Sequence, residues 1–137
     1  MTIIYTQKNT LGVDEFKDVL IASTLADMRP VSDVNRLEAM LRNANLIVTA
    51  RLEGKLIGVS RAITDYAYCC YLSDLAVDQN FQKQGIGKKL IQLTHDYAGA
   101  DNTVLLLTAA PAAHEYYGKI GMQEVKNGWS IARGTRL

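Results

Sequence analysis

The feature that most constrains the fold is a pair of strongly apolar runs that flank a helical pattern. Residues 68–77, "YCCYLSDLAV", and residues 103–110, "TVLLLTAA", are apolar enough to form buried strands inside a sheet. The segment between them begins at Gly85, ends at Gly99 and repeats apolar residues at helical spacing: Ile86, Leu90, Leu93 and Tyr97. A strand, a helix and a second strand form a βαβ unit, so we predict that the two strands are parallel.

The residues before this unit predict two helices and an antiparallel hairpin. Residues 14–26 and 32–43 carry apolar residues on one helical face, and Ser32 is placed to cap the second helix. Residues 44–65 consist of two apolar runs joined by "LEGK", a composition typical of a β-hairpin.

The residues after the unit predict a short helix and a closing hairpin. The helix begins at Pro111 and extends to about Lys119, and residues 122–133 form the hairpin around Asn127-Gly128. The complete order predicts a single domain over residues 1–137 with an α/β (α+β) fold. Its sheet is expected to be mixed, mostly antiparallel and twisted, with a central parallel βαβ pair and helices on both faces.

The overall charge gives no sign of a polyanionic partner. Fifteen Lys and Arg face fourteen Asp and Glu, so the net charge is +1, and we expect neither nucleic acid nor a membrane as a partner. No apolar run approaches the ~20 residues that span a bilayer. The N-terminus, "MTIIYTQKNT", lacks the pattern of a signal peptide.

The cysteines point to a reducing compartment. Cys69 and Cys70 are adjacent, and neighbours in a strand face opposite sides of the sheet, where they are badly placed to bond with each other. We therefore interpret them as reduced thiols of a cytoplasmic protein. His95 and His114 are too far away in the sequence to complete a zinc-binding pattern, so we expect no metal.

The stretch "DQNFQKQGIGKKLI", residues 78–91, indicates an anion site at the start of the predicted helix. The first N–H groups of a helix have no internal partner, and the helix dipole makes that end partly positive. Gly85 and Gly87 remove two β-carbons there, and neighbouring side chains add donors and positive charge: Gln82, Lys83, Gln84 and Lys88. We predict that this loop binds a phosphate or pyrophosphate.

Three phosphate loops can be compared with this stretch. A Walker loop requires glycine at the position of Gln82, and a dinucleotide fingerprint requires glycine or alanine at the position of Leu90. The pattern Gln/Arg-x-x-Gly-x-Gly/Ala is matched in full by residues 82–87, and it resembles the coenzyme A loop of the GNAT superfamily of N-acetyltransferases. A second stretch, "AAPAAHEYYGKIGM" at residues 109–122, resembles a later helix of the same family.

The resemblance, which extends from about residue 3 to residue 133, implies transfer of an acetyl group from acetyl-CoA to the primary amine of a small molecule. The family binds the diphosphate on residues that correspond here to Gln82, Lys83, Gln84, Gly85, Ile86, Gly87 and Lys88. The pantetheine arm pairs with a strand, here at Leu75, Ala76 and Val77. The Leu75 N–H is expected to polarise the thioester carbonyl while the amine attacks directly.

The same resemblance assigns the proton transfers. Tyr117 aligns with the tyrosine that protonates the leaving thiolate, and Tyr116 with an aromatic residue that packs. For the base, strand alternation puts Tyr71 and Ser73 on one face and Asp74 on the other, so we expect a water held by Ser73, Tyr71 and backbone carbonyls. A bulge could turn Asp74 inward as an alternative base, but an ion pair or a cap elsewhere is the favoured interpretation of this residue.

The acceptor is the least defined part of the prediction. Arg29, in the link between the first two helices, can hold a carboxylate or phosphate of the acceptor, cap a helix, or pair with Asp27 or Asp33. Residues 109–111, Ala-Ala-Pro, replace an asparagine that contacts the coenzyme in many relatives. Two other functions stay open: acetylation of protein lysines or N-termini, and a non-catalytic CoA-binding regulatory module. A homodimer is expected from the resemblance alone.

Overall fold

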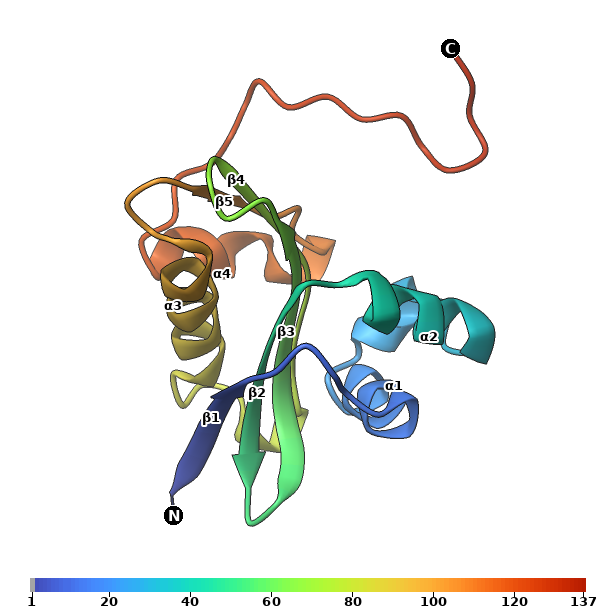
Figure 1. The fold of residues 1–137 in the computed structure, drawn as a ribbon, viewed down its shortest axis with the longest axis vertical. Coiled ribbons are helices and arrows are strands. Elements are labelled where there is room, and N and C mark those ends of the chain that lie inside the picture. Colours follow the sequence, from blue (N-terminus) through green and yellow to red (C-terminus); the bar gives the residue numbers. More distant parts are fainter. Residues whose placement is uncertain (1) are drawn as a thin grey trace.

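A computed structural model describes residues 2–137 and shows one five-stranded sheet with the strand order β1-β2-β3-β4-β5 (Figure 1). The pairs β1–β2, β2–β3 and β3–β4 are antiparallel. The pair β4–β5 is parallel, as the βαβ pattern predicts. The strands are β1 (Ile3–Gln7), β2 (Leu46–Leu52), β3 (Lys55–Thr64), β4 (Cys69–Val77) and β5 (Val104–Leu106).

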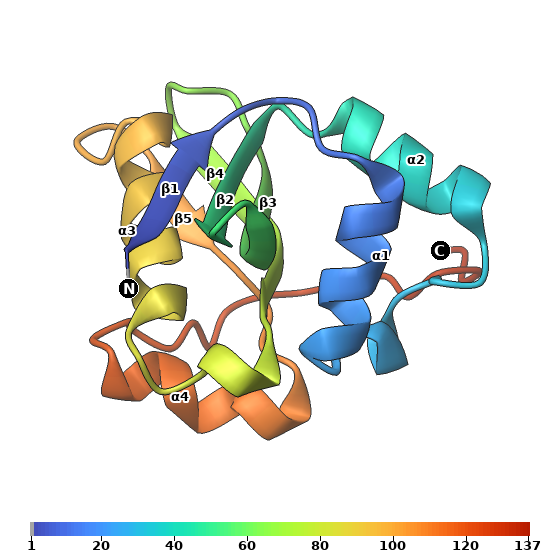
Figure 2. The same cartoon turned by 90° about the horizontal axis from the view of Figure 1, so that it is seen from below.

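Helices cover both faces of the sheet, which confirms the predicted fold class. The helices α1 (Val13–Ala22) and α2 (Val34–Asn43) lie on one face, and α3 (Ile86–Ala98) and α4 (His114–Lys119) lie on the other (Figures 1 and 2). Three short 3₁₀ turns connect them: Leu25–Met28, Gln79–Phe81 and Pro111–Ala113. None of the helices among residues 2–137 is both long and apolar enough to cross a membrane.

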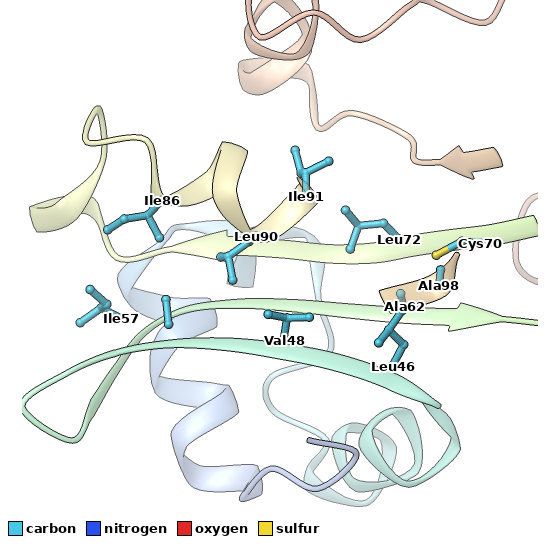
Figure 3. Close-up of a cluster of buried hydrophobic side chains, with 11 residues drawn as sticks. Leu46, Val48, Ile57, Ala62, Cys70, Leu72, Ile86, Leu90, Ile91 and Ala98 are labelled. Atoms are coloured by element: carbon cyan, nitrogen blue, oxygen red, sulfur yellow. The ribbon is translucent and has the colours of Figure 1, made fainter. Parts of the chain in front are cut away.

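Each face of the sheet has its own hydrophobic core. The core under α3 is shown in Figure 3, and its buried members include Leu46, Val48, Leu72, Ile86 and Leu90. The core under α1 and α2 includes Phe16, Leu20, Leu37, Ile47 and Val59. The sheet is therefore held from both sides, and β2 and β3 are its most buried strands.

The first two helices differ from the prediction at their ends. α1 stops at Ala22 instead of residue 26, because the Ser23 hydroxyl donates to the Leu20 carbonyl (3.0 Å) and accepts from the Leu25 N–H (3.2 Å). Thr24 follows in a left-handed conformation (φ 70°) that no helix can continue. The cap of α2 is Asp33, which accepts from the Arg36 N–H (3.1 Å), and not Ser32.

The C-terminal half of the sheet also differs from the prediction. β5 covers three residues instead of residues 103–110, and it lies at the sheet edge with Val104 69% exposed. The hairpin predicted for residues 122–133 is wrong, since that segment contains no strand and is exposed from residue 123 onward. The first strand, β1, was not predicted at all, and it forms the opposite edge of the sheet.

Helix α3 provides a direct test of the core. Leu90 is fully buried against β3, whereas Tyr97, predicted to share its face, is 48% exposed. We expect Leu90→Ala to lower the free energy of unfolding by about 2–5 kcal/mol, because the truncation leaves a cavity. Urea denaturation measures the change. Tyr97→Ala is the control on the same helix, and an equal loss in both variants would contradict the assigned helix face.

Candidate active site

A cleft opens where β4 and β5 separate. The two strands pair from Cys69 opposite Val104 to Tyr71 opposite Leu106, and β4 then continues to Val77 without a partner on that side. The space between them belongs to a cleft of about 930 Å³. Its walls include residues of β4, the segment that follows β5, the start of α3 and α4: Leu75, Val77, Leu107, Ala109, Gly87, Lys88 and Tyr117. The volume lies within the range of small-molecule sites.

The glycine loop lines this cleft. Gly85 precedes α3 with φ 81°, a left-handed conformation that favours glycine, and its carbonyl accepts the first bond of the helix from the Lys89 N–H (3.0 Å). The N–H groups of residues 86–88 therefore have no partner within the helix. The Gln82 side chain donates to the Val77 carbonyl (2.9 Å) and ties the loop to the end of β4. The loop thus presents main-chain donors and two lysines to an anion.

Gly87 lies against Tyr116, which the sequence did not suggest. A β-carbon at Gly87 would come within 2.7 Å of the Tyr116 hydroxyl oxygen. Burial raises the pKa of Tyr116, and a hydrogen bond from the Lys88 backbone N–H lowers it. Tyr116 therefore does more than pack, because its hydroxyl reaches the main-chain donors at the start of α3.

Tyr117 lines the cleft and is partly buried. Its ring meets that of Tyr116 edge to face, with centroids 5.2 Å apart and planes at 75°. Burial raises the pKa of the Tyr117 phenol above its ordinary value, and nearby Tyr116 acts in the same direction, whereas the Arg29 guanidinium lowers it. The net rise keeps Tyr117 protonated at neutral pH, so the residue can act as a proton donor.

A β-bulge in β4 changes which side chains share a face. Arg61 of β3 lies opposite Asp74, and the next residue, Ala62, lies opposite Leu72, so Ser73 is the extra residue. Leu72 packs in the core under α3, whereas Asp74 turns to the face covered by α1 and α2. Simple alternation predicted opposite faces for Tyr71 and Asp74. The bulge places both on the same face.

Asp74 is the centre of a buried charge network. Its side chain has no exposed surface, and its two carboxylate oxygens bind the Nε atoms of Arg29 and Arg61. Arg61 also donates to the Met40 carbonyl (3.2 Å) and the Ser73 hydroxyl (3.0 Å), and Arg29 donates to the Ser73 carbonyl (2.8 Å). The network joins the link after α1, helix α2 and the bulge into one unit.

The geometry agrees with comparisons to known proteins. The family model described as "Acetyltransferase (GNAT) family" matches residues 14–122. The chain belongs to the GNAT family of acetyltransferases. It is 26% identical over 124 residues to the uncharacterized N-acetyltransferase ycf52 of Pyropia yezoensis, covering 78% of this chain and 71% of that protein. It is 29% identical over 106 residues to the histone acetyltransferase TAP1 of Glycine max, covering 69% of this chain and 46% of that protein.

A solved structure shows the same fold. The aminoglycoside N-acetyltransferase AAC(6')-Iy, crystallised in complex with CoA, superposes with a TM-score of 0.74 at 15% identity. The match covers 98% of this chain and 96% of that one. At this level of identity the likeness establishes the GNAT fold.

The GNAT residues predicted from sequence occupy different parts of the site. Leu75, Val77 and most of the glycine loop line the cleft, whereas the Ala76 side chain is buried under α1 and offers only its backbone. Arg29 lines the cleft, but it pairs with Asp74 and not with Asp27 or Asp33. An acceptor would meet Asp74 only through Arg29 and Arg61, because Asp74 has no exposed side-chain surface.

The two residues expected to hold a water are also engaged. The Ser73 hydroxyl accepts from Arg61, and the Tyr71 hydroxyl lies 3.4 Å from the Thr108 hydroxyl, across the opening between β4 and the segment after β5. Arg61, which could not be distinguished from a surface arginine in the sequence, is 6% exposed and holds the bulge. The signal that could have identified it is the charged Asp74 inside an otherwise apolar strand.

The buried network predicts a large effect on stability. We expect Arg61→Met to lower the free energy of unfolding by about 3 kcal/mol or more, because Asp74 loses one of its two partners inside the protein. Arg51→Met is the matched control, since the Arg51–Glu15 pair is much more exposed and should contribute less than about 1 kcal/mol. Chemical denaturation compares the two variants. Similar losses would show that the network does not stabilise the fold.

Proposed function

We propose that this chain transfers an acetyl group from acetyl-CoA to the primary amine of a small molecule by direct attack. The observation that carries the proposal is the cleft between β4 and the segment after β5, which is lined by both the glycine loop and Tyr117. This lining suits a cosubstrate that carries a diphosphate for the loop and a thioester for Tyr117. The CoA complex of the similarly folded aminoglycoside acetyltransferase supports the choice of carrier.

The residues present fit this carrier. At Gly87 the backbone is bare, and a β-carbon there would meet the Tyr116 hydroxyl at 2.7 Å, so no side chain larger than that of glycine fits at this position beside the donors of residues 86–88. Lys83 and Lys88 also line the cleft and supply positive charge. These features favour a diphosphate over a neutral ligand.

The chain's own residues divide the chemistry among them. Coenzyme A supplies the acetyl group as a thioester. The main chain of Leu75–Val77 orients the pantetheine arm, and the Leu75 N–H stabilises charge on the carbonyl oxygen. Tyr117 donates a proton to the departing sulfur. Both oxygens of Asp74 are bound by arginines, so a water molecule near Ser73 and Tyr71 is the better candidate to take the amine proton.

A protein substrate is the second candidate. The soybean relative is named as a histone acetyltransferase, and it shares 29% identity with this chain over the aligned residues. The similarly folded enzyme AAC(6')-Iy is named as an aminoglycoside acetyltransferase, and this supports a small-molecule acceptor for the present chain. Peptides bearing lysine therefore belong in the same assay as small amines.

The proposal is tested by binding and turnover together. Acetyl-CoA at a hundredfold excess over its Kd should stabilise the fold by about 2.7 kcal/mol in a thermal-shift measurement. Addition of a small primary amine should then release the free thiol of coenzyme A. Addition of peptides should release less of this thiol. Stabilisation without thiol release from any amine or peptide would favour a regulatory module. No stabilisation by the coenzyme would refute the proposal.

Tyr117 is tested separately. We expect Tyr117→Phe to lower kcat by about a hundredfold, because the leaving sulfur loses its proton donor, while the Kd for acetyl-CoA changes little. Steady-state kinetics and calorimetry measure the two quantities. Tyr97→Phe removes an equivalent hydroxyl from the exposed side of α3 and should leave both unchanged. A normal kcat in Tyr117→Phe would remove this residue from the mechanism.

A further inference from the structure

The Asp74 network, defined here as Arg29, Arg61 and Asp74, has an unbalanced charge. Two guanidinium groups share one carboxylate, and no other Asp or Glu within residues 2–137 forms an ion pair with either arginine. The network therefore holds one net positive charge. Its Asp74 side chain has no exposed surface, and those of Arg29 and Arg61 are 20% and 7% exposed. A charge with so little water around it is weakly screened and acts over a longer distance than a surface charge.

Arg29 is the member of the network that lines the cleft. Each of its three guanidinium nitrogens donates to a different acceptor: Nε to the Asp74 carboxylate, Nη1 to the Met28 carbonyl (2.8 Å) and Nη2 to the Ser73 carbonyl (2.8 Å). The guanidinium is thus fixed beside β4, two residues before the Leu75 N–H that is expected to bind the thioester carbonyl. From backbone dimensions, the Arg29 guanidinium lies within about 10 Å of the Leu75 nitrogen.

The other charged side chains of the cleft leave the network's charge in place. Lys83 and Lys88 belong to the glycine loop, where the diphosphate would neutralise them. Among the described residues that line the cleft, Asp27 carries the only carboxylate. It forms no ion pair with Arg29, and it is exposed to water, which screens its charge. The partly enclosed Arg29 guanidinium is therefore the stronger charge on this part of the wall.

The phenol of Tyr117 responds to the Arg29 charge inside the cleft. Burial raises the pKa of Tyr117, Tyr116 acts in the same direction, and the Arg29 guanidinium lowers it. A positive charge that favours a phenolate disfavours an ammonium ion for the same electrostatic reason. An amine bound in this part of the cleft therefore meets a field that destabilises its protonated form.

We propose that the net positive charge of the Asp74 network holds the acceptor amine in its neutral form, which is the form that attacks. The inference rests on the proposed transfer to a primary amine. On binding, the ammonium form releases one proton to bulk water. The neutral nitrogen then bonds to the thioester carbon as the carbon–sulfur bond breaks. The nitrogen gives one proton to the water near Ser73 and Tyr71, and the sulfur takes one from Tyr117, which regains it from solvent.

A fixed positive charge replaces a side-chain base at the first of these proton transfers. Both oxygens of Asp74 are bound by arginines, so this carboxylate is not free to accept a proton. The network instead lowers the pKa of the bound amine, and solvent then removes the proton. At about 10 Å and an effective dielectric constant of about 20, one unit charge lowers this pKa by about one unit.

The pH dependence of kcat tests the inference, because kcat reports the pKa of the bound amine. The probe is benzylamine, or the small primary amine that releases thiol faster in the same assay. We expect the acidic limb of the wild-type profile to lie about one unit below the pKa of the free amine in the same buffer. A limb at or above that pKa would overturn the inference, whether or not any variant folds. Absence of thiol release from every amine would instead be a failure of the proposed function.

Variants of Arg29 separate its charge from its structural role. We expect Arg29→Met to move the acidic limb up by about one unit, so that kcat falls about tenfold below the limb and matches the wild type on the plateau. The alkaline limb, assigned to Tyr117, should also move up, because the phenol loses a positive neighbour. Arg29→Lys keeps the charge and should leave the acidic limb within about 0.3 units of the wild type.

Arg51→Met is the matched control. Arg51 pairs with Glu15 and is not among the residues that line the cleft, so its loss should leave both limbs unchanged. Stabilisation by acetyl-CoA in a thermal-shift measurement verifies that each variant is folded. A uniform loss of kcat at every pH in Arg29→Met, or an equal shift of the acidic limb in Arg29→Met and Arg29→Lys, would reduce Arg29 to a structural role and overturn the inference.

Discussion

The separation of β4 from β5 is the constraint on which the rest of the site depends. Parallel strands held by a helical crossover are normally paired along their length, but here the ladder ends at Tyr71 and Leu106 while β4 continues for six residues. The main-chain groups on that side of β4 then face a cleft instead of a neighbouring strand. Because α3 starts beside the end of β4, its free N–H groups and the unpaired strand face the same space.

The bulge at Ser73 explains how the opening can be stable. An extra residue rotates the strand and turns Asp74 toward α1 and α2, where two arginines bind both of its oxygens. The same arginines also donate hydrogen bonds to Ser73: Arg61 to its hydroxyl and Arg29 to its carbonyl. Asp74, which would be costly to bury without partners, thus fixes the position at which β4 separates from β5. Through its arginines it also connects the cleft to α1 and α2 on the other face.

Much of this arrangement could be predicted from sequence, and the failures have physical causes. The βαβ unit and the glycine loop have strong local patterns, so their place and parallel pairing were predicted correctly. The bulge in β4 was only one of several alternatives that the sequence left open for Asp74. The bulge depends on Arg61 of β3, which is distant in the sequence from the glycine loop. The hairpin at residues 122–133 was wrong because a turn signal predicts a turn only when both strands have a sheet to join. The role of Tyr116 depends on the tertiary approach of α4 to α3.

The position of Tyr116 has a consequence for the energetics of ligand entry. Its hydroxyl lies at the bare backbone of Gly87, where a β-carbon would come within 2.7 Å of it, so the phenol borders the main-chain donors at the start of α3 before any anion arrives. An anion that docks on these donors enters space that the phenol partly occupies, and the cost of moving the ring offsets part of the favourable enthalpy of docking. The displaced ring must also find a new rotamer, which makes the loop a place where association can be slowed by a side-chain rearrangement as well as by diffusion.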